Sequence, residues 1–429
     1  MAVMLTVAVV TVALFLFSVL FFPAVGKNKK IKIYSWIPFI GAVFMIIFGE
    51  LGWDDVFRAF TENTSVNPLK ILILFLSMTV YSLILDKTGF FRYISGVVLK
   101  KSGRNQYVIF LSLYAVIAVL TVFTSNDIVI LTFTPFICSF CRAAKIDVIP
   151  YLIMEFVVAN TWSLFLLIGN PTNIYISGAF NISFTEYFIN MALPTVAAGL
   201  VSLALMLLMF GKKLRSPVDT HTDIERINDK PLMAVALVHL LACIVLLAVS
   251  QYTGMEMWFI SLVMAISAIV CSLSVLLFRR KSIAPVGHAL KGMPFEIIPF
   301  VIGMFIIVMG LDIAGVTEFI SGVLNVGDGV LSYGLASLFS SNFLNNIPMS
   351  VLFSKILSFS PSMPQIYATI AGSNIGAFLT PVGALAGIMW SNLVKENKVK
   401  LSVGKFVCYG MAIGIPTMLA SLFVIMVVV

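Results

Sequence analysis

The amino-acid sequence predicts an all-α polytopic membrane protein that contains an inverted repeat. Hydrophobic residues make up 60% of the 429 residues and charged residues only 11%, and the mean hydropathy is +1.07. Soluble domains of this length do not reach such values. Apolar segments alternate with short charged loops along the chain, and similar polar interruptions occur in both halves in the same order. These observations together indicate two related membrane-embedded halves.

The first half, residues 1–211, is predicted to contain five spans and one hairpin. The first segment is longer than a signal peptide and has no cleavage site, so it is expected to be a retained span. The fourth span begins near residue 148 and is broken by the motif Gly169-Asn170-Pro171-Thr172-Asn173. The other predicted spans lie near residues 3–24, 34–49, 69–85 and 191–211.

The second half, residues 233–429, follows the same pattern after a charged segment, residues 212–232, which is the predicted linker. A span near residues 365–392 is broken at Thr380-Pro381-Val382-Gly383. The remaining spans are predicted near residues 233–251, 257–278, 297–312 and 406–428. Pro and Gly in these breaks free backbone carbonyls, which a membrane tolerates only where they line a cavity.

The loop charges predict the orientation in the membrane. When the loops are assigned alternately to the two sides, all but Arg58, Lys70 and Lys355 of the 27 Lys and Arg residues fall on one side. By the positive-inside rule this side is cytoplasmic, which places the linker inside and both termini outside. The net charge of +8 therefore lies in loops between spans and does not indicate nucleic-acid binding.

Two apolar stretches are predicted to return to the side from which they enter. Basic residues flank residues 105–141 at both ends, so this stretch crosses an even number of times or not at all. In residues 329–354 each arm has only about 13 residues, or about 20 Å of helix, against a hydrocarbon core of about 30 Å. We therefore expect re-entrant hairpins at 105–141 and 329–354, with their tips near the membrane midplane.

An internal repeat extends this interpretation to both halves. Leu85-Asp86 through Gly89 and Tyr93 through Val97 correspond to Leu311-Asp312 through Gly315 and Phe319 through Val323, at a constant offset of 226 residues. Each half then has five spans and one hairpin, ten spans and two hairpins in all. An odd number of spans forces the two halves into opposite orientations, and substrate sites of such transporters lie at the repeat interface.

The hairpin tips and the broken spans are the predicted substrate site. Each tip aims the N-terminus of its second arm at the membrane centre, which favours an anion or a polar oxygen, whereas freed carbonyls suit a cation. Asp127 is the leading candidate for coupling to an ion, because an ionisable group inside a membrane is costly. The predicted substrate-binding residues are Ser125, Asn126, Asp127, Gly169, Asn170, Pro171, Thr172, Asn173, Ser341, Asn342, Asn345, Asn346, Ser373, Asn374, Thr380, Pro381 and Gly383.

Simpler interpretations remain open for several of these residues. Ser125 to Asp127 could form a plain outer turn, and Gly169 to Asn173 a packed kink. Glu155 could carry a proton or cation, or it could reach the cytoplasmic interface. Cys138 and Cys141 share one helix face and could offer soft ligands, although such residues are more often core fillers. His-Glu-x-x-His and Gly-x-Ser-x-Gly patterns do not occur, so the sequence does not favour an enzyme, and a channel would not require paired breaks.

The order of these motifs resembles the ion transporter superfamily and, within it, bacterial arsenite-efflux permeases of the ArsB type. The resemblance also includes Asn345-Asn346-Ile347-Pro348, Gly372-Ser373-Asn374-Ile375-Gly376 and Thr317 to Val326. It implies a scaffold and a mobile transport subdomain with elevator-like motion, a homodimer in the prokaryotic plasma membrane, and export of arsenite or antimonite as the neutral hydroxide with proton entry. It implies no cofactor beyond a coupling H⁺ or Na⁺, and a soluble ATPase partner if the protein is of the arsenite type.

More distant relatives in that superfamily are sodium-coupled carboxylate symporters and sodium/proton antiporters, so a di- or tricarboxylate permease is the alternative function. Arsenite permeases typically carry acidic residues where this chain has Asn160 and Asn374, and a cysteine where it has Ser373. Because an amide cannot carry a proton, coupling through those positions is lost or moved. The candidate coupling residues are Asp127, Asn160 and Glu155.

Overall fold

The computed structural model describes residues 2–21, 32–49, 51–63, 67–216, 218, 226–325 and 329–429. Every regular element within these ranges is helical, as predicted. The elements of the first half are α1 (Ala2–Phe21), α2 (Ile37–Phe48), α3 (Trp53–Thr61), α4 (Pro68–Lys87), α5 (Phe90–Ser102), α6 (Gln106–Phe123), α7 (Asn126–Ala143), α8 (Ile149–Trp162), α9 (Pro171–Ala179) and α10 (Phe184–Phe210).

The second half likewise combines long helices with short and broken ones. Its elements are α11 (Lys230–Ala248), α12 (Ser250–Thr253), α13 (Met257–Phe278), α14 (Ala284–Lys291), α15 (Ile297–Ile313), α16 (Val316–Leu324), α17 (Val330–Leu344), α18 (Asn346–Ser358), α19 (Met363–Ile375), α20 (Leu385–Glu396) and α21 (Val403–Val428). Part of the predicted linker, residues 217 and 219–225, lies outside the described residues.

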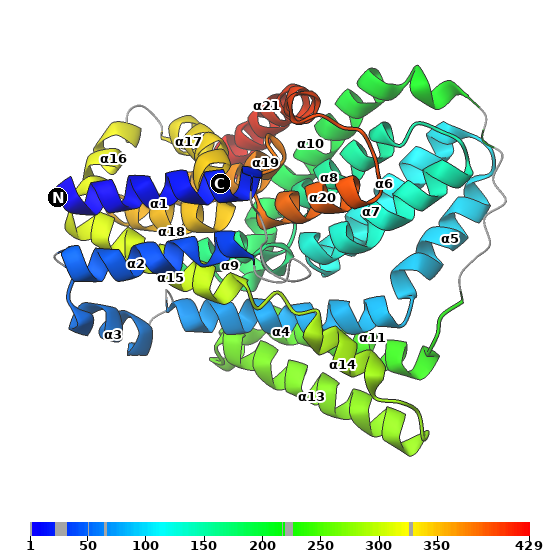
Figure 1. The fold of residues 1–429 in the computed structure, drawn as a ribbon, viewed down its shortest axis with the longest axis horizontal. Helices are drawn as coiled ribbons and strands as arrows, with labels where there is room; N and C mark the ends of the chain where they lie inside the picture. Colours follow the sequence, from blue (N-terminus) through cyan, green and yellow to red (C-terminus); the bar gives the residue numbers. More distant parts are fainter. Residues whose placement is uncertain are drawn as a thin grey trace.

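Seven helices in the described part of the chain are long and apolar enough to cross a membrane, or eight if the bent pair α15 and α16 forms one span. They are α1, α4, α6, α10, α11, α13 and α21. This set includes α6, an arm of the first predicted hairpin, whereas α2 and the halves of the two broken spans are shorter. The ten spans and the re-entrant course of residues 105–141 therefore remain predictions. Figure 1 shows α1, α2, α4, α13 and α15 running roughly parallel, with α3 and α16 at the end that carries the N-terminus.

The short helices α3, α5, α14 and α16 occupy segments between the predicted spans that were expected to be loops. α5 carries the basic residues Arg92, Lys100 and Lys101, and α3 carries Asp54 and Asp55 in its first turn. α16 follows α15 at an angle of 80°. Gly89 and Gly315 precede α5 and α16 with φ of 79° and 73°, a left-handed conformation that favours glycine. The two glycines belong to the repeated segments, so both halves change direction at equivalent positions.

Both predicted hairpins are pairs of helices joined by one or two polar residues. Thr124 and Ser125 separate α6 from α7, and the Ser125 hydroxyl accepts a hydrogen bond from the Asp127 backbone N–H at 3.3 Å. Asn345 separates α17 from α18 with φ of 73°, and its side chain accepts from the Ile347 N–H at 3.4 Å. Polar side chains here cap the new helix, as Ser and Asn do at helix N-termini. α17 and α18 are only about 22 and 20 Å long at 1.5 Å per residue.

The second arm of each hairpin packs against a helix of the other half. α7 contacts α20, and α18 contacts α9, while α10 packs along α21. A second group is formed by α2 against α15 and by α4 against α13. Close approach requires glycine at some of these contacts: a Cβ on Gly372 of α19 would overlap Ser337 of α17, and one on Gly303 of α15 would overlap the backbone of α2 at Phe39.

Asp229 joins the start of α11 to the end of α13. Its carboxylate caps the Leu232 N–H at 3.1 Å and pairs with Arg279 at 2.6 Å and Lys281 at 2.7 Å. Burial alone would raise the pKa of Asp229, but hydrogen bonds from Lys281, from the Leu232 N–H and from Arg279 lower it below its ordinary value. A lowered folded-state pKa gives stability that is present at neutral pH and lost as the pH falls through that pKa.

Asp229→Ala is therefore expected to destabilise the protein by roughly 1–2 kcal/mol at neutral pH, through loss of the cap and of two partly exposed ion pairs. Thermal unfolding in detergent at neutral and acid pH measures this, and the difference from wild type should shrink in acid. Asp229→Asn is the matched control, because it keeps the cap and removes only the charge. An unchanged melting temperature for the Asn variant at neutral pH would show that the ion pairs contribute nothing.

Candidate functional site

A buried network of amides and hydroxyls connects the first broken span to α19. Asn374, which is 0% exposed, accepts hydrogen bonds from Ser163 Oγ at 2.9 Å and from Asn170 Nδ2 at 2.8 Å. Its own Nδ2 donates to Asn173 Oδ1 at 2.7 Å, and Ser373 Oγ donates to Thr172 Oγ1 at 3.0 Å. Residues 201 to 211 positions apart in sequence thus form one polar cluster, which we call the Asn374 network.

The first hairpin tip is connected to the Asn374 network through α8. Asn126 Nδ2 donates to Asn160 Oδ1 at 3.1 Å, and Ser163 Oγ lies 2.8 Å from the Asn160 carbonyl oxygen as well as 2.9 Å from Asn374 Oδ1. Asn160 is fully buried. Its amide therefore fills, with hydrogen bonds rather than charge, a position at which the family resemblance leads one to expect an acidic residue.

The second hairpin tip contacts the second broken span. Asn342 Nδ2 donates to the Gly376 carbonyl at 3.1 Å, and Asn342 Oδ1 accepts from Thr380 Oγ1 at 2.7 Å. Asn345 Nδ2 donates to the Val382 carbonyl at 3.0 Å, and the Asn346 backbone N–H donates to the Gly383 carbonyl at 2.9 Å. The carbonyls freed where α19 ends are thus satisfied by the amides of the tip.

The breaks in α-helical structure do not coincide fully with the predicted motifs, and both begin a few residues before them. The first break covers residues 163–170, so Pro171 begins α9, and Thr172 and Asn173 lie in its first turn. The second break covers residues 376–384 and includes Thr380, Pro381 and Gly383. Pro171 stands at the first helical position, where its missing N–H costs nothing. Ser341 lies in α17, buried, and its hydroxyl donates to the Ser337 carbonyl rather than to the tip.

A cavity of about 280 Å³ opens beside the first hairpin tip. Ser125 and Asp127 line it together with Thr79 of α4, and with charged residues near the starts of α2 and α15. Lys32 forms an ion pair with Glu296 there, and Lys291 also lines the cavity. Asp127 thus shares the cavity with two basic side chains, Lys32 and Lys291, and one acidic side chain, Glu296. These three residues lie near the ends of α2 and α15 that are predicted to be cytoplasmic.

Lys32, Glu296, Lys291 and Thr79 are site residues that the sequence reasoning missed. Lys32 and Glu296 are 264 positions apart, and each looks like an ordinary loop charge in the sequence. The sequence signal for Lys32 and Glu296 is that each charge stands directly before a predicted apolar span, where it can reach the membrane boundary. Glu155 lies apart from the cavity: it is buried between α7 and α20 and does not belong to the set of side chains that line the cavity.

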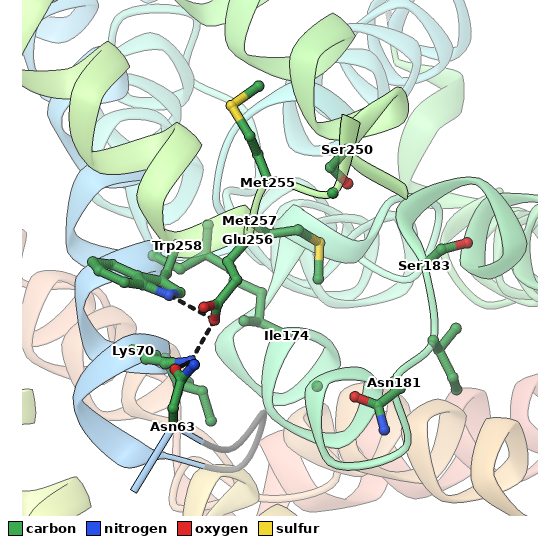
Figure 2. Close-up of a pocket in the computed structure, with 15 residues that line it drawn as sticks. Asn63, Lys70, Ile174, Asn181, Ser183, Ser250, Met255, Glu256, Met257 and Trp258 are labelled. Carbon is green, nitrogen blue, oxygen red and sulfur yellow. Dashed lines mark hydrogen bonds and ion pairs between the residues drawn. The ribbon is translucent and has the colours of Figure 1, made fainter. Parts of the chain in front are cut away.

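A second cavity, of about 440 Å³, lies toward the other ends of the helices, between α4, α9 and the start of α13. In Figure 2 the Glu256 carboxylate accepts hydrogen bonds from Lys70 and from Trp258 Nε1, the second at 2.8 Å. Asn181 and Ser183 lie on the opposite side of the cavity. The hydrogen bond from Lys70 lowers the pKa of Glu256 below its ordinary value. The ion pair therefore joins α4 to α13 beside the end of α9.

The described residues contain no group of three or more His, Cys, Asp or Glu side chains that could hold a metal ion. Cys138 and Cys141 are buried free thiols on α7. The chemistry available at the candidate site is therefore hydrogen bonding by amides and hydroxyls, plus the charges of Asp127 and the residues around it.

The fold is similar to that of a solved membrane protein. It superposes on the crystal structure of the YdaH transporter of Alcanivorax borkumensis, described as having an unusual topology, with a TM-score of 0.58 and 11% identity, covering 97% of this chain and 98% of that chain. The match at this identity concerns the fold alone.

Sequence comparison defines the family. The chain is 26% identical to the arsenical pump membrane protein of Escherichia coli K12 over 405 residues, 90% of this chain and 92% of that protein. It is 22% identical to a putative arsenical pump membrane protein of Bacillus subtilis, over 86% of this chain and 88% of that protein. The family model described as "Citrate transporter" (CitMHS) matches residues 12–368. The chain belongs to this family of ion-coupled transporters and is an integral protein of the bacterial plasma membrane.

Proposed function

We propose that this protein exports arsenite or antimonite as the neutral hydroxide, in exchange for protons that enter the cell. The observation that carries this proposal is that amides and hydroxyls form the Asn374 network and the second hairpin tip, while the charges beside the first tip balance one another. The Asn374 network and both tips offer amides and hydroxyls, which suit a small uncharged molecule with several O–H groups. The similarity to arsenical pump membrane proteins extends over 90% of the chain and supports the same substrate class.

The charges around Asp127 also favour a neutral substrate. The described residues that line the cavity of about 280 Å³ include two carboxylates, Asp127 and Glu296, and two ammonium groups, Lys32 and Lys291. Lys32 is already paired with Glu296. The cavity therefore has no surplus of positive charge for a substrate with two or three negative charges. A proton on Asp127 would remove one negative charge, so proton binding there changes the balance that the substrate meets.

A second function, a sodium- or proton-coupled di- or tricarboxylate permease, is favoured by two observations. The family model is described as a citrate transporter, and Lys291 lines the cavity near the N-terminal end of α7. Helix N-termini attract anions, so a substrate carboxylate could bind between Lys291 and the N-terminus of α7. The two functions differ in whether transport responds to arsenite or to citrate.

Transport assays decide between the two functions. In everted vesicles or proteoliposomes with an imposed pH gradient, the protein is expected to move arsenite and antimonite, and unlabelled arsenite should compete with that flux. Citrate and succinate should neither be transported nor compete. Liposomes without protein are the control for passive permeation. Citrate counterflow in the absence of arsenite flux would overturn the metalloid proposal and establish the carboxylate function instead.

A further inference from the structure

Glu155 is a fully buried carboxyl group whose hydrogen-bond partner, the Thr134 hydroxyl, also contacts a backbone carbonyl. It lies in the middle of α8 and is 0% exposed. Thr134 Oγ1 of α7 is 2.8 Å from Glu155 Oε1 and also 2.7 Å from the carbonyl oxygen of Ile130. A hydroxyl group has one proton to donate and can serve only one of these acceptors. If that proton goes to the Ile130 carbonyl, Glu155 must donate to the threonine, and it can do so only as the neutral acid.

The surroundings supply no positive charge for a carboxylate. Among the described residues, no Lys, Arg or His lies within ion-pair distance of Glu155, and Glu155 Oε2 has no protein hydrogen-bond partner. An uncompensated buried charge is strongly destabilising, whereas the neutral acid avoids this cost. Both the hydrogen bonds and the missing counter-charge therefore favour a proton on Glu155 in this conformation.

Trp390 of α20 lies between Glu155 and a cavity. Its indole lies near the carboxyl group, and its buried Nε1 makes no hydrogen bond with an atom of the described residues. Its ring packs against Phe156 and Phe406, with centroid distances of 5.1 Å in both cases. The same tryptophan lines a cavity of about 100 Å³ whose wall includes Lys395 and Ser402, at the end of α20 that is predicted to be cytoplasmic. This cavity is separate from the one beside Asp127.

We propose that Glu155 is a second proton-binding site, distinct from Asp127, that holds a proton in this conformation and exchanges it with the predicted cytoplasmic side past Trp390. The proton binds to the carboxylate to give the neutral acid, and it leaves to water in the cavity. The part of this inference that concerns coupling rests on the proposed function. The protonation of Glu155 itself does not depend on which substrate is transported.

The ionisable group that faces Glu155 from a neighbouring helix is the thiol of Cys138 on α7. The tyrosines of the other helices around α8 are engaged elsewhere: Tyr114 of α6 with the Gly199 carbonyl, Tyr187 of α10 with the Leu164 carbonyl, Tyr367 of α19 with Asn190, and Tyr409 of α21 with the ring of Phe210. Lys395 and Glu396 of α20 are exposed at the far end of that helix. The infrared signal of a protonated Glu155 carboxyl group can therefore be distinguished from the signals of these thiol, phenol and exposed groups.

Infrared difference spectroscopy of the full-length protein in liposomes tests the site directly. Wild type is expected to show the C=O stretch of a protonated carboxylic acid at neutral pH, and this band should disappear in Glu155→Gln. The band should persist in Glu318→Gln, which alters an exposed carboxylate of α16. A spectrum in which Glu155→Gln removes only a carboxylate band would overturn the proposal. This readout is independent of arsenite, so it holds or fails separately from the proposed function.

The coupling role is tested in the same proteoliposomes. Glutamine resembles the neutral acid in shape, so Glu155→Gln should fold and keep solute counterflow, while proton-driven accumulation across a one-unit pH gradient should fall by about tenfold. Trp390→Phe keeps the ring packing and should alter the pH dependence without abolishing transport. Full proton-driven accumulation by Glu155→Gln would exclude Glu155 from coupling.

Discussion

Replacing Asp127 with asparagine is expected to abolish proton- or sodium-driven transport. Asp127 lines the cavity beside the first hairpin tip and lies in the first turn of α7, where its backbone N–H is capped by Ser125 Oγ at 3.3 Å. Asparagine has nearly the same size and keeps this backbone geometry, but it can neither carry a charge nor release a proton. Accumulation driven by an ion gradient in proteoliposomes should therefore fall to the level of protein-free liposomes.

The matched control for Asp127→Asn is Glu318→Gln, which makes the same kind of change on the exposed surface of α16. It should leave gradient-driven flux unchanged. Counterflow, which needs no net ion movement, separates a loss of coupling from a loss of folding. Undiminished gradient-driven accumulation by Asp127→Asn would remove this residue from the coupling mechanism and leave Glu155 as the ionisable candidate.

Replacing Asn374 with leucine is expected to destabilise the protein and, if Asn374 belongs to the substrate site as proposed, to disable transport. Leucine would leave Asn170 Nδ2 and Asn173 Oδ1 buried without the partners they now have at 2.8 and 2.7 Å. Each unsatisfied buried group costs about 1–3 kcal/mol. The melting temperature in detergent should fall, and counterflow should be lost. Asn325→Leu, at the exposed C-cap of α16, is the control: it removes one hydrogen bond, to Ser321 Oγ at 3.2 Å, so it should leave counterflow unchanged and lower the melting temperature far less.

Asn374→Asp sharpens this test, because it changes the charge at constant size. A carboxylate at this position could still accept from Ser163 and Asn170, but it would face Asn173 Oδ1, which now accepts from the Asn374 amide at 2.7 Å. Two acceptors at that distance need a proton or a cation between them. Transport by Asn374→Asp should therefore become more strongly dependent on pH or on Na⁺ than transport by wild type. Wild-type dependence on both would contradict the proposed role of the network.

The sequence was sufficient to predict the features that depend on local physical constraints. Asn345 and Asn346 interrupt an apolar stretch too short to cross twice, and the structure has a two-helix hairpin there. Pro171 and Thr380-Pro381 mark points where a helix must end or begin, and the structure breaks both helices next to them. In each case a local feature fixes the conformation: either a side chain that caps backbone N–H groups or a proline that lacks an N–H. These features can be predicted without knowing which distant residues come into contact.

The features that the sequence could not predict depend on contacts between distant residues. The ion pair of Lys32 with Glu296 and the hydrogen bonds of Asn374 with Asn170 and Asn173 join positions far apart, and their side chains follow no helical or strand period. α5 was treated as a basic loop because its charges obscured a helix of 13 residues. The roles of the site residues remain predictions that the transport assays test, and the inverted orientation of the two halves remains a prediction.

The exchange of partners between the two halves affects how the protein is made. The second arm of the first hairpin, α7, packs against α20, which starts at Leu385 of a 429-residue chain. During synthesis, α7 therefore enters the membrane long before the helix that covers it exists. Until nearly nine-tenths of the chain has been translated, the face of α7 that α20 covers needs a temporary partner in the lipid, the insertion machinery or a chaperone. Truncation before residue 385 should consequently yield a protein that inserts but is degraded.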